Sequence, residues 1–136
     1  MKIKASSQCS YCDGIDDISH FFFHCANVHY LWNQFFALWN EVEYYKVNFP
    51  NYPNAKDILF GITNAHNGNE VMNFCVIHVK FYIYKRRLFS DNMMTLRELC
   101  NELLFKLEVE KQILAKEDRL VHFDKYLPLY NKLKTH

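Results

Sequence analysis

The chain has 136 residues, of which 50% are hydrophobic and 17% aromatic, and its formal net charge is +1. This length suits one domain with a single core, and the near-neutral balance gives no overall field that would attract nucleic acid or a membrane. With only three Gly and three Pro, the composition argues against a disordered chain and against a turn-rich all-β fold. We therefore expect a mainly α single domain over residues 1–136.

The first predicted helix covers residues 26–47 and follows an N-terminal segment at 1–25. Its apolar residues recur at the spacing of a core-facing helix. They are Val28, Leu31, Trp32, Phe35, Phe36, Leu38, Trp39 and Val42. Pro50 and Pro53 then predict an extended linker over residues 48–56, because proline lacks a backbone donor and restricts the residue before it.

The middle of the chain predicts two further helical segments. A short helical turn, closed by Gly61, is expected within residues 57–63. The segment 70–89 is apolar on most sides, which is typical of a buried central helix, and its basic end suits the helix dipole. Its uninterrupted apolar run is shorter than a membrane span requires, so we expect no membrane association.

The last predicted helix covers residues 95–126. Thr95 and Glu98 have the spacing of a capping box at its start. Leucines at positions 96, 99, 103, 107 and 114 lie on or near one stripe. Pro128 is expected to stop this helix and leave a tail at 127–136. The expected architecture is thus a small N-terminal knuckle packed on three or four helices.

Four residues near the N-terminus have the spacing of a metal site. Cys9, Cys12, His20 and Cys25 follow the pattern C-x2-C-x7-H-x4-C. Two cysteines separated by two residues can reach one ion from a tight turn, and a second pair closes a tetrahedral Cys3His set around Zn²⁺. Three thiolates and one imidazole leave no open position, so this pattern predicts a structural zinc knuckle rather than a catalytic site.

The fourth ligand has an alternative. On an ideal helix Cys25 would lie about 140° around from His20, whereas His24 would share its face. His24 would therefore replace Cys25 if the backbone stayed helical through residue 25. We expect instead that the backbone breaks before Cys25 and that the next helix begins there.

The motif and its surroundings resemble a known family. The Cys-x-x-Cys pair is followed by Asp17-x-x-His20-Phe21-Phe22-Phe23-x-Cys25 and then by Trp32. This arrangement resembles the zinc-binding segment at the C-terminal end of the reverse transcriptases of LINE-type, non-LTR retrotransposons. The blocks at 57–61 and 80–87 also resemble the region C-terminal to the motif in such proteins. The resemblance implies binding of element RNA or target DNA in support of target-primed reverse transcription, beside a reverse transcriptase core.

Catalysis by this chain is not expected. Polymerases hold two metal ions on a carboxylate pair, and the only Asp-Asp here, at positions 16 and 17, lies inside the knuckle. The chain therefore looks like a fragment, a truncated element or a stand-alone relative of such a polyprotein. A different class remains open, a zinc-pinned helical module that contacts protein through exposed aromatics of the Trp32 to Trp39 helix. Cys75 and Cys100, at apolar helix positions, are interpreted as buried thiols rather than nucleophiles.

The predicted contact with nucleic acid lies far from the knuckle. Asp13, Asp16 and Asp17 make the knuckle a poor phosphate surface, although Tyr11 or Phe22 offers a ring for stacking. The better candidates, with tyrosines interleaved, are Lys80, Lys85, Arg86 and Arg87. The alternative interpretation of these cations is a solvated helix end matched to the dipole.

The expected location of the protein is intracellular, either nuclear or cytoplasmic, and not secreted. The N-terminus carries no apolar signal segment, and five cysteines are an odd number for a disulfide framework.

Overall fold

The computed structural model describes residues 20–48, 53–61, 67–89 and 94–135. Every regular element within these ranges is helical, comprising six α-helices, one π-helical turn and one 3-10 helix. The predicted mainly α class is confirmed for this part of the chain, with more helices than the three or four expected. Cys9 and Cys12 lie outside the described residues, as do Tyr11 and the three aspartates of the knuckle, so the zinc knuckle stays a prediction.

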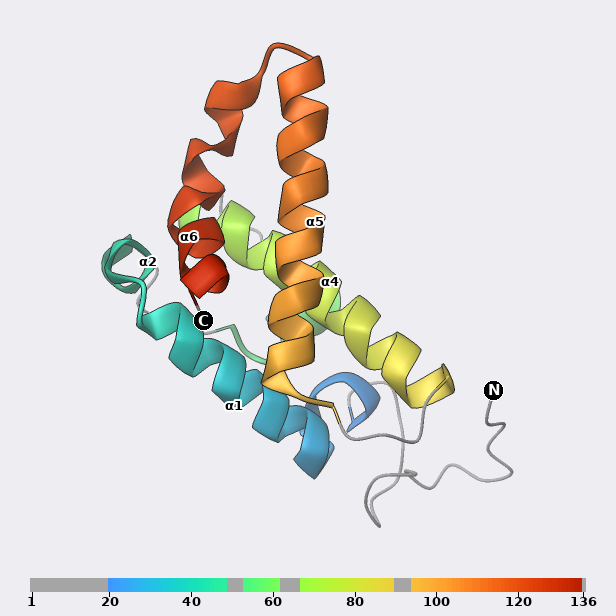
Figure 1. The fold of residues 1–136 in the computed structure, drawn as a ribbon. Coiled ribbons are helices and arrows are strands. Elements are labelled where there is room, and N and C mark those ends of the chain that lie inside the picture. Colours follow the sequence, from blue (N-terminus) through green and yellow to red (C-terminus); the bar gives the residue numbers. More distant parts are fainter. Residues whose placement is uncertain (1–19, 49–52, 62–66, 90–93, 136) are drawn as a thin grey trace.

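The helices run as η1 (His20–His24), α1 (Ala26–Asn40), α2 (Glu43–Asn48), α3 (Ala55–Phe60), α4 (Asn67–Phe89), α5 (Leu96–Lys116), η2 (Leu120–Tyr126) and α6 (Leu127–Thr135). Figure 1 shows η2 and α6 returning alongside α5, while α4 crosses α5 and α1 runs below them. The structure accordingly places α5 in contact with α4, η2, α6 and α1. Among the described helices, none has both the length and the apolar character needed to cross a bilayer.

One aromatic face of α1 forms much of the core. Trp32, Phe35 and Trp39 have no exposed surface, and Phe36 is also buried. The aromatic rings pack on one another, with Trp32 and Phe36 stacked at 5.7 Å between centroids. The rings from Trp32 to Trp39 are therefore covered by the fold itself, whereas Tyr30 on the same helix is 65% exposed.

The helix predicted over residues 26–47 is interrupted. α1 ends at Asn40, where the amide of Val42 donates to the carbonyl of Trp39 at 3.1 Å in a tighter three-residue turn. α2 then starts at Glu43 in a new direction. The turn brings Tyr45 into the core, where its ring stacks on Trp39 at 4.2 Å between centroids. Burial of the Tyr45 ring therefore stabilises the change of direction between α1 and α2.

The middle helices begin earlier than predicted. α3 starts at Ala55 because Asn54 and Asp57 form a reciprocal capping box, with bonds of 2.9 and 3.2 Å. It ends before Gly61, whose φ of 92° is readily adopted only by glycine, so the helix does not reach residue 63. The predicted closure by Gly61 is confirmed. α4 covers Asn67–Phe89 and starts three residues before the predicted segment 70–89.

The long C-terminal helix is shorter than predicted. Its leucine stripe is confirmed, since Leu99, Leu103, Leu107 and Leu114 are buried. However, α5 ends at Lys116 instead of Tyr126, because Asp118 adopts a φ of 57° and the amide of Arg119 donates to the carbonyl of Leu114 at 2.8 Å. This is the helix-ending arrangement usually made by glycine.

The segment predicted as a tail is also helical. Residues Leu127–Thr135 form α6, and Pro128 lies in its first turn, where a missing backbone donor costs nothing. One side of α6 is buried in the core, at Leu129, Tyr130 and Leu133. The proline therefore starts a helix here instead of stopping one.

Candidate metal centre and basic helix end

The segment that carries two predicted zinc ligands forms a single π-helical turn. The amide of Cys25 donates to the carbonyl of His20 at 2.9 Å, which closes an i to i+5 hydrogen bond. Cys25 itself has φ −58° and ψ 134°, and α1 begins at the next residue. The predicted break in the backbone at this point is confirmed. The identity of the fourth ligand, Cys25 or His24, stays a prediction, because this backbone bond does not fix the direction of either side chain.

Two of the four predicted zinc ligands, His20 and Cys25, lie at the start of this turn and directly after it. Cys25 is fully buried and precedes the first turn of α1, where the orphan N–H groups favour negative charge. His20 is half-buried, whereas His24 is exposed. The described residues contain no group of three or more metal-ligating side chains, and the other two predicted ligands lie outside them. The ligand assignment therefore remains a prediction.

Two side chains from different helices hold this turn by its backbone. The indole Nε1 of Trp32 donates to the carbonyl of Phe22 at 2.7 Å. Nη1 of Arg87, at the end of α4, donates to the carbonyl of Phe21 at 2.8 Å, and its guanidinium lies 4.2 Å from the centroid of the Phe21 ring. We call Trp32 and Arg87 the clasp. The clasp fixes two consecutive carbonyls between His20 and Cys25 to the helical body.

Two of the four cations predicted to bind nucleic acid are turned toward the protein. Arg87 is only 6% exposed and serves in the clasp. Nζ of Lys80 donates to the carbonyl of Leu59 at 3.2 Å and lies 5.6 Å from the centroid of the Phe22 ring. Burial lowers the pKa of Lys80. Neither side chain presents its charge freely to a phosphate.

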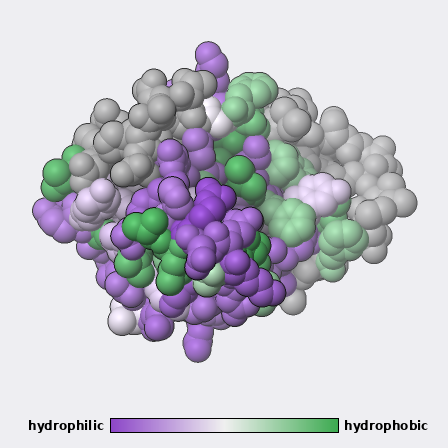
Figure 2. Space-filling view, turned by 90° about the horizontal axis from the view of Figure 1, so that it is seen from above, coloured by the Kyte–Doolittle hydropathy of each residue, from purple (hydrophilic) through white to green (hydrophobic). Residues whose placement is uncertain are grey.

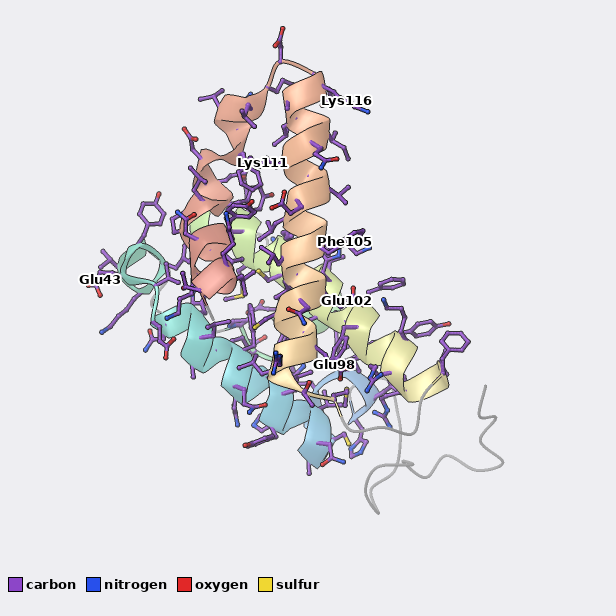
Figure 3. The ribbon with its side chains drawn as sticks, in the orientation of Figure 1. Glu43, Glu98, Glu102, Phe105, Lys111 and Lys116 are labelled. Carbon is purple, nitrogen blue, oxygen red and sulfur yellow. The ribbon has the colours of Figure 1, made fainter. Side chains whose placement is uncertain are left out.

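The other two cations lie at the surface in ion pairs with α5. Lys85 is 2.9 Å from Glu102, and Arg86 is 3.1 Å from Glu98. Figure 3 shows both glutamates on the side of α5 from which the end of α4 extends. Such partly exposed pairs contribute little to stability and can be exchanged for another anion. A phosphate contact by Lys85 and Arg86 therefore stays a prediction.

The same region exposes three aromatic rings, of which the sequence analysis had singled out only Tyr84. Phe81 is 46% exposed, Tyr84 45% and Phe105 61%. In Figure 3, Phe105 points away from α5 above Glu102, on the side of the end of α4. On the right of Figure 2, where α4 ends in Figure 1, hydrophobic side chains gather on the surface. The sequence could have indicated that Phe105 is exposed, because this residue lies on the side of the predicted helix opposite the leucine stripe.

We define the α4–α5 face as Phe81, Tyr84, Lys85, Arg86, Phe105 and Lys106. An open groove of about 790 Å³ runs between the two helices on this face, and a neighbouring groove of about 400 Å³ adjoins it. Lys106 lines both grooves. Its Nζ lies 5.7 Å from the centroid of Phe81 and 5.8 Å from that of Phe105. Rings and cations are thus intermixed along one surface.

The remaining thiols lie inside the core. Cys75 and Cys100 are buried, as predicted. Burial raises the pKa of the Cys75 thiol, and it raises that of Cys100 to about 11. A thiol must ionise to act as a nucleophile, so these two side chains are suited to packing rather than to covalent chemistry.

Comparisons of the chain with protein-family models, with curated proteins and with solved structures find no match. The functional interpretation therefore depends on the residues and geometry described above.

Proposed function

We propose that the chain is a zinc-stabilised accessory domain related to the C-terminal region of LINE-type reverse transcriptases. In this role it binds RNA or DNA to support target-primed reverse transcription beside a polymerase core, and it carries out no catalysis of its own. Zn²⁺ is its structural cofactor, held by Cys9, Cys12, His20 and Cys25.

The observation that carries the zinc proposal is the five-residue turn from His20 to Cys25. The spacing of the motif requires these two side chains to converge, and the proposal is supported by the backbone hydrogen bond that joins Cys25 to His20 within this turn. The clasp then holds the turn between α1 and α4. An ion bound here would pin the preceding segment to a preformed support, which is the role of a structural zinc site.

The nucleic-acid proposal is supported by the exposed cations of α4 and α5. Lys85 retains an exposed fraction of 36% despite its pairing with Glu102. Phosphate contacts from such lysines and arginines supply most of the affinity in nonspecific binding and make it depend on salt. The buried clasp residue Arg87 has a structural role in this proposal.

The test has two measurements on the zinc-loaded chain. Metal analysis of the purified protein should find about one equivalent of zinc, the number of ions that four ligands complete. Fluorescence anisotropy with labelled RNA and DNA should show binding that weakens as salt increases. Protein without zinc, or without affinity for either nucleic acid at low salt, would contradict the corresponding half of the proposal.

A second candidate is a zinc-pinned helical module that binds protein. One observation favours it, namely the exposed Ile77 one helical turn before the exposed Phe81 in the smaller groove, because apolar surface of this kind is common at protein interfaces. This candidate predicts association that is retained at high salt. The salt dependence of binding therefore separates the two functions.

A further inference from the structure

The α4–α5 face combines exposed aromatic rings with cations beside two adjoining grooves. Phe81, Tyr84 and Phe105 expose about half of their surface, and the grooves beside them are lined by cations that face outward and by two carboxylates. These cations are Lys85, Arg86 and Lys106, and the carboxylates are Glu98 and Glu102. The occupant that this surface suits is therefore aromatic or apolar in part and negatively charged.

We propose that the α4–α5 face binds single-stranded nucleic acid, with Phe81, Tyr84 and Phe105 stacking on bases and Lys85, Arg86 and Lys106 contacting phosphates. This inference rests on the proposed function and names the form of nucleic acid and the surface. Proteins that bind single strands use this combination of exposed rings and a basic groove. A duplex hides the faces of its bases, so it can use the cations but not the rings.

The placement of the cations favours a strand over a protein partner. Nζ of Lys85 lies 4.9 Å from the centroid of Phe81, and Lys106 lies beside both Phe81 and Phe105. Lysine is depleted in the centres of protein interfaces, where its desolvation is costly. In a strand complex the same lysines stay near water and meet phosphates while the rings take the bases.

One ion pair makes the face ready to accept phosphate. Lys85 and Glu102 are both partly exposed, so exchanging this carboxylate for a phosphate costs little. Glu98 also accepts from the hydroxyl of the buried Tyr82 at 3.1 Å and therefore stays in place. Replacing Glu102 with glutamine should strengthen binding, since it removes negative charge without removing a ring.

The experiment measures anisotropy of labelled single strands of about 12 nucleotides, a length within the usual site size, and of the matching duplex. The zinc-loaded chain should bind the single strands more tightly. Phe105→Ala should weaken that binding about tenfold or more, because stacking on one aromatic ring contributes on that scale. Phe60→Ala is the matched control, since Phe60 is exposed on α3 and lies outside both grooves.

Charge reversals provide the second arm. Lys106→Glu should weaken binding and flatten its salt dependence, whereas Lys116→Glu, at the far end of the same helix, should have a much smaller effect (Figure 3). Circular dichroism of each variant checks the fold, which substitutions at these exposed or partly exposed positions should leave unchanged.

The outcomes separate this inference from the proposed function. If the chain binds strands but Phe105→Ala and Phe60→Ala behave alike, the assigned surface is wrong while the proposed function stands. Equal affinity for duplex and single strand would also overturn the inference. If no nucleic acid binds at low salt, both fail. Self-association that is lost in Phe105→Ala, without strand binding, would show a protein interface instead.

Discussion

Nη1 of Arg87 donates a hydrogen bond to the carbonyl oxygen of Phe21 at 2.8 Å, across 66 residues of sequence. The guanidinium also lies over the Phe21 ring and is almost fully buried. One side chain thus connects the end of α4 to the turn that carries His20 and Cys25. A residue predicted from sequence to face phosphates has a structural partner within the fold.

Replacing Arg87 should destabilise the fold more than replacing its neighbour. Arg87→Met keeps an apolar stem but leaves the Phe21 carbonyl without this donor, and a hydrogen bond from a charged group contributes about 2–3 kcal/mol. The free energy of unfolding, measured in urea, should fall by that amount.

The matched control is Arg86→Met. Arg86 pairs with Glu98 near the surface, so its loss should cost about 1 kcal/mol or less. Equal losses in the two variants would contradict a special role for Arg87. A folded Arg87→Met chain that keeps its stability but loses affinity for nucleic acid would restore the phosphate-binding interpretation.

The identity of the fourth zinc ligand can be tested by two substitutions. Cys25→Ser should abolish tight zinc binding, because the fully buried Cys25 is the predicted fourth ligand. His24→Ala should keep about one equivalent of zinc, since His24 is exposed and only the alternative ligand. Metal analysis measures the stoichiometry, and absorption of the cobalt-substituted chain reports the number of thiolate ligands. The reverse pattern would make His24 the ligand.

The phenol of Tyr45 joins α2 to the C-terminal helices. Its hydroxyl donates to the carbonyl of Lys125 at 2.8 Å and accepts from the amide of Leu129 at 3.1 Å. Tyr45→Phe would leave both backbone groups without this partner, which costs about 1–3 kcal/mol for each buried group left unsatisfied. Thermal unfolding should detect the loss. Tyr30→Phe, at an exposed position of α1, should leave the midpoint nearly unchanged.

Local pattern was sufficient to predict some of these elements. The leucines of α5 recur on one stripe, and the side chain of Thr95 accepts from the amide of Glu98, as its spacing indicates. However, only half of the capping box forms, because the amide of Thr95 donates to the hydroxyl of Tyr82 instead. The start of α5 was predictable, while its link to α4 depends on a contact between helices.

The helix ends and the clasp could not be predicted from local sequence pattern. α5 stops where Asp118 adopts a conformation that the sequence signals reliably only when glycine is present. α1 ends before the predicted residue 47, because the chain turns so that the ring of Tyr45 stacks on Trp39 in the core. The role of Arg87 depends on a partner in a distant segment. In each case the deciding interaction is tertiary, so residue spacing could not reveal it.

The fold should lose stability at alkaline pH. Burial, assisted by the nearby carboxylates of Glu110 and Glu70, raises the pKa of Tyr126 to about 12. A raised pKa means that the folded state holds its proton when the unfolded chain has begun to lose it. The contribution of protonated Tyr126 to the free energy of unfolding is therefore fully present below about pH 10, the ordinary tyrosine pKa. It is lost as pH rises toward 12.

Tyr126→Phe isolates this effect. The variant keeps the ring in its site beside Phe74 and Phe123 but has no proton to lose. Between about pH 10 and 11 the free energy of unfolding of the wild type should decline more steeply than that of the variant, by up to about 1.4 kcal/mol per pH unit for one group. Urea unfolding at several pH values measures both slopes. Parallel curves would mean that Tyr126 ionises alike in the folded and unfolded chain, and that the alkaline loss arises from other groups, such as the buried thiols of Cys75 and Cys100.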